Sequence, residues 1–297
     1  MQAAGVTLLS WNIVGDGRWT GRTRFGIEQR STPASGEQAA YFRRWLDIMR
    51  KYLAGIDLPH VRSPADIDAA RSGTPHVVIA IEGAGFAADG AELLAQFHGD
   101  GLRHVQLVHY IRNALGDFQT EAPQHNGLAQ AGVDLVKDCN RLGILVDLAH
   151  ATGPAIDKAL EVSSAPMIWS HSALTTYEYS WRHSASQSRL LHLDYARKIA
   201  RRGGAVGLWN LRASVGSSPS GYASELMRMA DAIGPEHVMF GTDLDGVGEL
   251  GTMGQLGDLR KVADLLVQRG VDEKVLRALC FDNYARCLRS ALQAKPT

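Results

Sequence analysis

Two short apolar stretches of this chain each end in a histidine, and they decide the fold class. "ILVDLAHATG" (residues 144–153) carries His150, and "APMIWSHSAL" (residues 165–174) carries His171. Both stretches are mostly apolar rather than alternating, which is typical of strands that are buried on both faces. A helical pattern over residues 128–143 precedes the first stretch and ends in a glycine. Strand and helix therefore alternate, which predicts a parallel sheet with right-handed crossovers.

The same alternation extends along the 297 residues. Apolar runs of strand length, with helical patterns between most of them, occupy residues 6–14, 77–81, 103–108, 144–148, 166–169, 205–209 and 237–240. A single domain over residues 1–297 favours an α/β fold of the (β/α)8 TIM-barrel type, with a flexible tail at 289–297; a doubly wound open sheet is the alternative. A closed barrel needs eight strands and we find seven runs, so we expect one strand to be missing. The segment 15–36 is rich in Gly, Arg, Ser and Thr, which predicts a long loop after the first strand.

Composition excludes several classes of protein. Lys plus Arg equals Asp plus Glu, 31 each, so no basic face predicts a nucleic-acid partner. No apolar run reaches the roughly 18 residues of a membrane span, and the first residues lack the pattern of a signal peptide. Three cysteines suit a reducing compartment. As written, the chain is expected to be cytoplasmic; a true start further upstream would make it periplasmic or exported.

Polar residues of one chemical type follow the predicted strands. The ends of five runs carry a metal-ligand or acid–base group: Glu82, His109, His150, His171 and, in "GTDLDG", Asp243 with Asp245. The C-terminal ends of barrel strands meet at one face, so we expect these groups to converge there. Alone, each has an ordinary structural explanation: a hydrogen-bonded histidine, a helix cap or an Asp–Gly turn. Together, two imidazoles and a carboxylate favour a zinc site with a position open for water.

Other catalytic patterns receive less support. The chain contains no GxSxG and no HExxH, and no GxGxxG follows a strand. His192 and Asp194 form an HxD pattern, but it opens a predicted helix rather than ending a strand, so we interpret it as coincidence.

At the strand-end residues the sequence resembles the membrane dipeptidase (renal dipeptidase) family of zinc peptidases, in the amidohydrolase-like barrel group. The matching stretches, in the family's order, are "IEGAG", "GLRHVQLVHYIRN", "NGLAQAGVDLVKDCNRLGILVDLAHATG", "APMIWSHSA" and "HVMFGTDLDGVG". The resemblance spans most of the chain. It implies a metal-dependent hydrolase that cleaves dipeptides with metal-activated water and binds two zinc ions.

The resemblance also implies roles for matching residues. Glu82 would bridge the two zinc ions, and His150 and His171 would complete the second zinc site. His109 would stabilise the oxyanion beside the scissile carbonyl. Arg182, eleven residues after His171, would bind the carboxylate of the substrate. Asp243 would carry the proton, and Asp245 would act as a supporting residue.

The chain departs from the family at its beginning. The family opens with a strand that ends in a His-x-Asp pair, which holds the first zinc, and we find no such pair here. The same N-terminal segment would supply both the eighth strand and the first zinc ligands, so the barrel would lack its first β-strand. We consider three explanations. The assigned translation start lies too far downstream, or the chain is a genuine short form that binds one metal ion or none. Alternatively, another residue such as Asp16 replaces the missing metal ligands. An open barrel edge would lower stability and favour association.

Three functional hypotheses follow. The leading one is a zinc-dependent dipeptidase, with a possible homodimer as assembly. The alternatives are a catalytically impaired form that acts as a binding or assembly protein, and another amidohydrolase-type barrel hydrolase, such as a lactonase or deaminase. Replacing Arg182 with Met separates the last from the first, since only a free-carboxylate substrate needs that cation.

Overall fold

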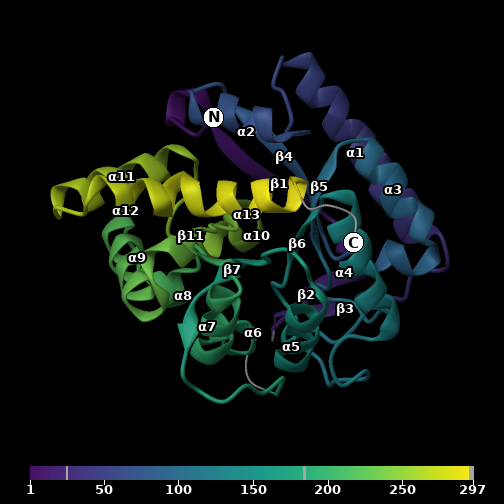
Figure 1. The fold of residues 1–297 in the computed structure, drawn as a ribbon. Coiled ribbons are helices and arrows are strands. Elements are labelled where there is room, and N and C mark those ends of the chain that lie inside the picture. Colours follow the sequence, from purple (N-terminus) through teal and green to yellow (C-terminus); the bar gives the residue numbers. More distant parts are fainter. Residues whose placement is uncertain (25, 183–184, 294–297) are drawn as a thin grey trace.

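The computed structural model describes residues 1–24, 26–182 and 185–293. Parallel strands form one curled sheet with helices around it (Figure 1), which confirms the predicted α/β barrel class. The strands, in their order along the sheet, are β1 (Leu8–Val14), β4 (His76–Glu82), β5 (Leu102–Gln106), β6 (Leu145–Asp147), β7 (Ile168–Ser172), β10 (Ala205–Leu208) and β11 (Val238–Phe240). Each of the seven predicted apolar runs contributes one of these seven strands. Sheet order follows chain order, as in a barrel and unlike a doubly wound open sheet, whose strand order reverses.

Helices connect the strands and cover the outer face of the sheet (Figure 1). The longer ones are α1 (Glu37–Gly55), α2 (Pro64–Arg71), α3 (Ala91–Gly99), α4 (Gln130–Leu142), α5 (Gly153–Val162), α7 (Leu193–Arg201), α9 (Pro219–Ile233), α11 (Gly257–Gln268), α12 (Glu273–Arg277) and α13 (Asn283–Leu292). Short helices are α6 (Ala185–Ser188), α8 (Arg212–Val215) and α10 (Leu244–Val247). The predicted stop of α4 is confirmed: Gly143 follows it with φ 76°, a left-handed conformation that glycine adopts without strain.

Two small strand pairs lie outside the main sheet. β2 (Thr20–Thr23) and β3 (Gly26–Gln29) pair antiparallel, and β8 (Leu174–Thr175) pairs with β9 (Leu191–His192). The long loop predicted over residues 15–36 therefore contains one short antiparallel strand pair. Its four-residue strands are too short and too polar to show a period-two pattern.

Alternate residues of β4 face two different cores. Ile79 and Ile81 belong to the large core between sheet and helices, where Phe42, Phe86 and Phe97 also lie buried. Val78, the residue before Ile79, belongs to a second core inside the curl of the sheet. Because successive strand side chains point to opposite faces, Glu82 shares the inner face with Val78.

Helix α13 closes the end of the curl where the strands begin. It crosses the sheet in Figure 1, and its Ala285, Leu288 and Ala291 pack with inward-facing Leu145 and Ile168. The expected tail at 289–297 overlaps this helix over residues 289–292, and residues 294–297 lie outside the described residues.

The sheet has two ends, and they are β1 and β11. Within the described residues no strand pairing joins them, so the curl stays open along this line as the strand count predicted. Each of the two strands thus has one side without a described ladder partner. Among the helices that the structure describes, none is long and apolar enough to cross a membrane.

Candidate metal centre

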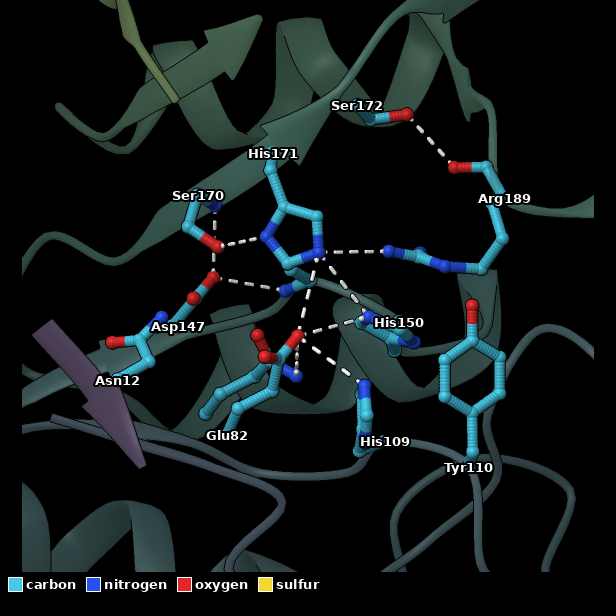
Figure 2. Close-up of polar contacts among 12 residues, drawn as sticks. Asn12, Glu82, His109, Tyr110, Asp147, His150, Ser170, His171, Ser172 and Arg189 are labelled. Carbon is cyan, nitrogen blue, oxygen red and sulfur yellow. Dashed lines mark hydrogen bonds and ion pairs between the residues drawn. The ribbon is translucent and has the colours of Figure 1, made fainter. Parts of the chain in front are cut away.

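The C-terminal ends of neighbouring strands bring four predicted residues together. Glu82 is the last residue of β4, His109 and His150 follow β5 and β6, and His171 lies near the end of β7. All four side chains are buried, with at most 7% of each residue exposed. In Figure 2 the three imidazoles point toward the carboxylate of Glu82. These residues converge because strands that alternate with helices run parallel, and parallel strands of one sheet end at the same face.

The distances in this cluster suit a metal ion. Oε1 of Glu82 lies 3.2 Å from Nε2 of His150 and 3.5 Å from Nε2 of His171. The two Nε2 atoms are 3.2 Å apart. Zinc–ligand bonds of about 2.0–2.1 Å in a tetrahedral site put ligand atoms roughly 3.3 Å from one another. Among the described residues, these three form the group whose ligand atoms lie within 4.8 Å of one another.

Hydrogen bonds fix which nitrogen of His171 faces the cluster. Nη2 of Arg189 lies 3.0 Å from Nε2 of His171, and a guanidinium can only donate, so Nε2 accepts. The proton of this imidazole is therefore on Nδ1, which donates to Oγ of Ser170 at 2.7 Å. An outer hydrogen bond of this kind orients a metal-binding imidazole. A metal ion at Nε2 would replace the bond from Arg189.

His150 is held in the cluster by an unusual backbone. Its φ is 71°, in the left-handed region, and its carbonyl accepts a hydrogen bond of 2.8 Å from the backbone N–H of Gln119. Its Nδ1 is buried and has no described partner. Burial, then the charges of Arg189 and the other histidines, holds the pKa of His150 well below its usual value, so the imidazole is neutral, as a metal ligand must be.

Asp16 supports His109 from the end of β1. Its Oδ1 lies 2.6 Å from Nδ1 of His109, and its Oδ2 accepts the backbone N–H of Tyr110 at 2.9 Å. Nε2 of His109 consequently faces Oε1 of Glu82 at 3.4 Å. Burial alone would lower the pKa of His109, but the charges of Asp16 and Glu82 raise it above its usual value. Both oxygens of Asp16 are thus engaged, and it lies outside the three-residue ligand group.

Two arginines follow His171, and they lie in different environments. Arg189 is 3% exposed and donates through Nη1 to Oε1 of Gln119 at 2.6 Å, besides its contact with His171 (Figure 2). Arg182 is exposed, and its guanidinium lies 5.0 Å from the centre of the Trp181 ring. The structure therefore places the sequence-predicted Arg182 at the surface and brings Arg189, which sequence reasoning missed, to the cluster. The only sequence signal was a cation directly before two leucines, in "SRLLH".

Asp243 follows β11 and, like His150, has a left-handed backbone, with φ 52°. Burial raises the pKa of this carboxyl to about 6, with the charge of Glu82 adding to the rise and those of His171 and Arg189 opposing it. The charges of Glu82, His171 and Arg189 therefore act on the pKa of Asp243. Asp245, the second acid of "TDLDG", is exposed.

Comparisons with known proteins agree with this geometry. The model of the membrane dipeptidase family (peptidase family M19) matches residues 35–297. Dipeptidase verJ of Clonostachys rogersoniana is 30% identical over 228 residues, which are 74% of this chain and 56% of that protein. With shares of 50% to 57%, the chain spans about half the length of the curated relatives first matched.

Solved structures share the fold. The structure of dipeptidase AC, a metallo peptidase of family M19, matches with a TM-score of 0.71 and 25% identity, over 86% of this chain and 77% of that one. A metallo peptidase from Rhodobacter sphaeroides, liganded with a phosphinate mimic of the dipeptide L-Ala-D-Ala, matches with a TM-score of 0.69 and 25% identity, over 86% of this chain and 73% of that one. With its strand-end cluster, its seven parallel strands and a family match over most of its length, this chain belongs to the membrane dipeptidase family, peptidase family M19.

Proposed function

We propose that this chain is a metal-dependent dipeptidase that hydrolyses the peptide bond of dipeptides. The observation that carries the proposal is the convergence of Glu82, His150 and His171 at the C-terminal ends of the strands, within the fold of family M19. The dipeptide mimic bound by the Rhodobacter sphaeroides relative supports dipeptides as the substrate class.

The donor set favours zinc as the metal. Two neutral imidazoles and one carboxylate, with spacings close to those of a tetrahedral site, are ligands that zinc takes in catalytic centres. When bound, zinc supplies Lewis acidity and a water that ionises near neutral pH. We propose one ion at these three residues; a second ion bridged by Glu82 needs ligands beyond this group.

Residues around the ligands would bind substrate and move protons. His109, held by Asp16 with Nε2 facing inward, would donate a hydrogen bond to the carbonyl oxygen as negative charge develops there. Asp243, whose pKa lies at about 6, would take a proton and return it to the leaving amine. For the substrate carboxylate we propose Arg189, because it is the buried arginine beside the cluster, and Arg182 stays the rival from sequence.

The test combines metal content with hydrolysis. Zinc-loaded, desalted protein is expected to retain zinc and to release free amino acids from L-Ala-L-Ala. Glu82→Gln should lower both retained zinc and kcat/KM, the latter by at least about a hundredfold, whereas Glu92→Gln, an exposed control on α3, should change neither. Zinc binding without hydrolysis of any dipeptide would instead favour the binding-protein hypothesis.

A further inference from the structure

A cluster of basic side chains lies where the strands begin, at the opposite end of the sheet from the metal centre. His60 and Arg62 belong to the segment before α2, and His60 forms a bridge with the second residue of β4. Arg50 comes from α1, His98 from the end of α3 and Arg103 from the start of β5. The charges of all three arginines act on the imidazole of His60, so these five residues, the basic cluster, lie near one another.

The carboxylates beside the basic cluster are engaged elsewhere. Asp100 pairs with Arg50 at 2.9 Å and with Arg43 at 3.2 Å, so two arginines share one negative charge. Oδ2 of Asp66 accepts the backbone N–H of Arg62 at 2.9 Å rather than its guanidinium. The cluster therefore keeps an excess of positive charge.

This excess is carried by Arg62 and Arg103. Arg103 is 6% exposed and donates through Nη1 to the carbonyls of His98 at 2.7 Å and Leu102 at 2.8 Å. Arg62 donates through Nη2 to the carbonyl of Gly99 at 2.6 Å. Within the described residues, neither guanidinium forms an ion pair with a carboxylate. The end of a helix such as α3 supplies only about half a negative charge, which cannot neutralise two guanidinium groups.

The imidazoles of the cluster respond to this charge. Burial, and then the charges of Arg103 and Arg62, lower the pKa of His98 to about 4. Burial and the charge of Arg62 lower even the pKa of Arg103, to about 10. Nε2 of His60 is buried and has no described partner. Positive groups that destabilise one another in this way are stabilised by an anion placed among them.

We propose that the basic cluster binds a phosphate group, either inorganic phosphate or the phosphate of a small soluble ester. The planar fork of a guanidinium matches two phosphate oxygens, and the donors of Arg62 and Arg103 come from two segments that meet at the end of α3. An anion with several acceptor oxygens uses such donors more fully than a carboxylate does. The proposal does not depend on the proposed function.

Calorimetric titration with inorganic phosphate, at constant ionic strength, tests the site. We expect saturable binding to the wild-type protein. Arg62→Gln should weaken it about tenfold to a hundredfold, because a charge-assisted hydrogen bond is lost. Arg62→Lys keeps the charge and should bind more tightly than Arg62→Gln, whereas Arg44→Gln, which changes an exposed arginine of α1, should match the wild type. No saturable binding, or equal binding by the wild type and Arg62→Gln, would overturn the proposal.

Two further measurements place the bound phosphate. Glu82→Gln, which alters the metal centre, should bind phosphate as the wild type does, and loss of binding in this variant would move the site to the metal centre. Phosphate should also raise the pKa of His98, followed by the NMR signal of its imidazole, and an unchanged pKa would contradict binding in the cluster.

The source of the phosphate group is separated by comparing ligands. Tighter binding of glycerol 3-phosphate than of inorganic phosphate would assign the site to esters, and the reverse order would assign it to the free ion. Binding to phosphatidylcholine vesicles that contain phosphatidic acid, without binding of either soluble ligand, would overturn the proposal in favour of a lipid surface.

Discussion

At the scale of single residues, the cluster depends on which nitrogen of each imidazole faces inward. Oγ of Ser170 accepts a hydrogen bond from Nδ1 of His171, and Oδ1 of Asp16 lies against Nδ1 of His109, so both rings present Nε2 to Glu82. Ser170 lies within β7, and Asp16 lies in the turn that follows β1. Such outer hydrogen bonds set ring orientation as strictly as the ligands set the metal.

Asp16 is expected to act on catalysis through His109. Asp16→Ala removes both hydrogen bonds that fix the ring, so kcat should fall about tenfold to a hundredfold while KM and retained zinc change little. Asp16→Asn can accept from only one of the two donors, so its kcat should lie between those of the wild type and Asp16→Ala. Steady-state kinetics on a dipeptide and zinc analysis check this, with Asp89→Ala, an exposed acid, as control. A rise in KM at constant kcat would contradict the positioning role.

The two arginines give opposite expectations for substrate affinity. Arg189→Met removes the buried cation and should raise KM for dipeptides about thirtyfold or more, because a buried charge pair loses its partner. Arg182→Met, at the surface, should leave KM unchanged. Circular dichroism confirms that each variant folds, since Arg189 also bonds Gln119. The reverse pattern of KM values would support the assignment made from sequence spacing.

Sequence could predict the strand-end residues but not this arginine. Glu82, His150 and His171 follow from a rule of parallel sheets, which needs only the strand pattern. Arg189 lies two residues before Leu191, and Leu191 of β9 pairs with Leu174 of β8 next to the strand that carries His171. No local pattern encodes a two-residue pairing of this kind. Spacing from His171 pointed to Arg182, which the structure shows exposed.

At the scale of elements, four strands and a helix share a buried polar layer beneath the metal centre. Ser10 of β1 and Tyr284 of α13 contact Nδ1 of His104 on β5, whose Nε2 lies 3.2 Å from Asp147 on β6. The other oxygen of Asp147 accepts the backbone N–H of Ser170 on β7 at 2.9 Å. This layer ties the strand that carries His171 to its neighbours. Buried networks of this type rigidify a fold when every member is satisfied.

This layer predicts a pH-dependent loss of stability. Burial alone would raise the pKa of Asp147, but the hydrogen bond and charge of His104 hold it below its usual value. Because the pKa of Asp147 is lower in the folded chain than in the unfolded chain, where it is about 3.9, the ionised carboxylate stabilises the fold at pH values above about 3.9. This contribution is lost as the pH falls through the pKa of the folded state. Asp147→Asn should therefore cost roughly 1–3 kcal/mol at pH 7, and the difference from wild type should shrink toward pH 3.

Urea unfolding at a series of pH values measures that difference. Asp134→Asn on the exposed face of α4 is the control and should match wild type throughout. A difference between wild type and Asp147→Asn that grows as pH falls would mean that the carboxyl is protonated in the native state.

At the scale of the whole molecule, an apolar stripe lies on the surface of α1 and continues onto Ile56, the residue that follows this helix. Trp45, Ile48, Tyr52 and Ile56 are 43% to 53% exposed and recur at helical spacing. Trp11 of β1 packs edge-on against Tyr52, with ring centres 5.8 Å apart. The stripe thus continues onto the strand at one end of the sheet. Exposed apolar area of this extent favours association.

Self-association should therefore depend on this stripe. The wild-type protein is expected to show a weight-average mass that rises with concentration in sedimentation experiments. The double variant Trp45→Gln, Ile48→Lys should reduce this rise, whereas Val267→Lys, which changes an exposed apolar residue of α11, should not. An unchanged rise in the double variant would place the contact elsewhere, for instance along the free sides of β1 and β11.

In engineering this protein for heat resistance, stability and function conflict at His150 and Asp243, because both residues have a left-handed backbone. Glycine at either position would relieve left-handed strain of roughly 1–2 kcal/mol, so a selection for folded protein alone would favour it. The same selection would erase one proposed metal ligand and the proposed proton carrier. A thermostable variant that still turns over substrate must therefore gain its stability at other positions, and screens should score folding and turnover together.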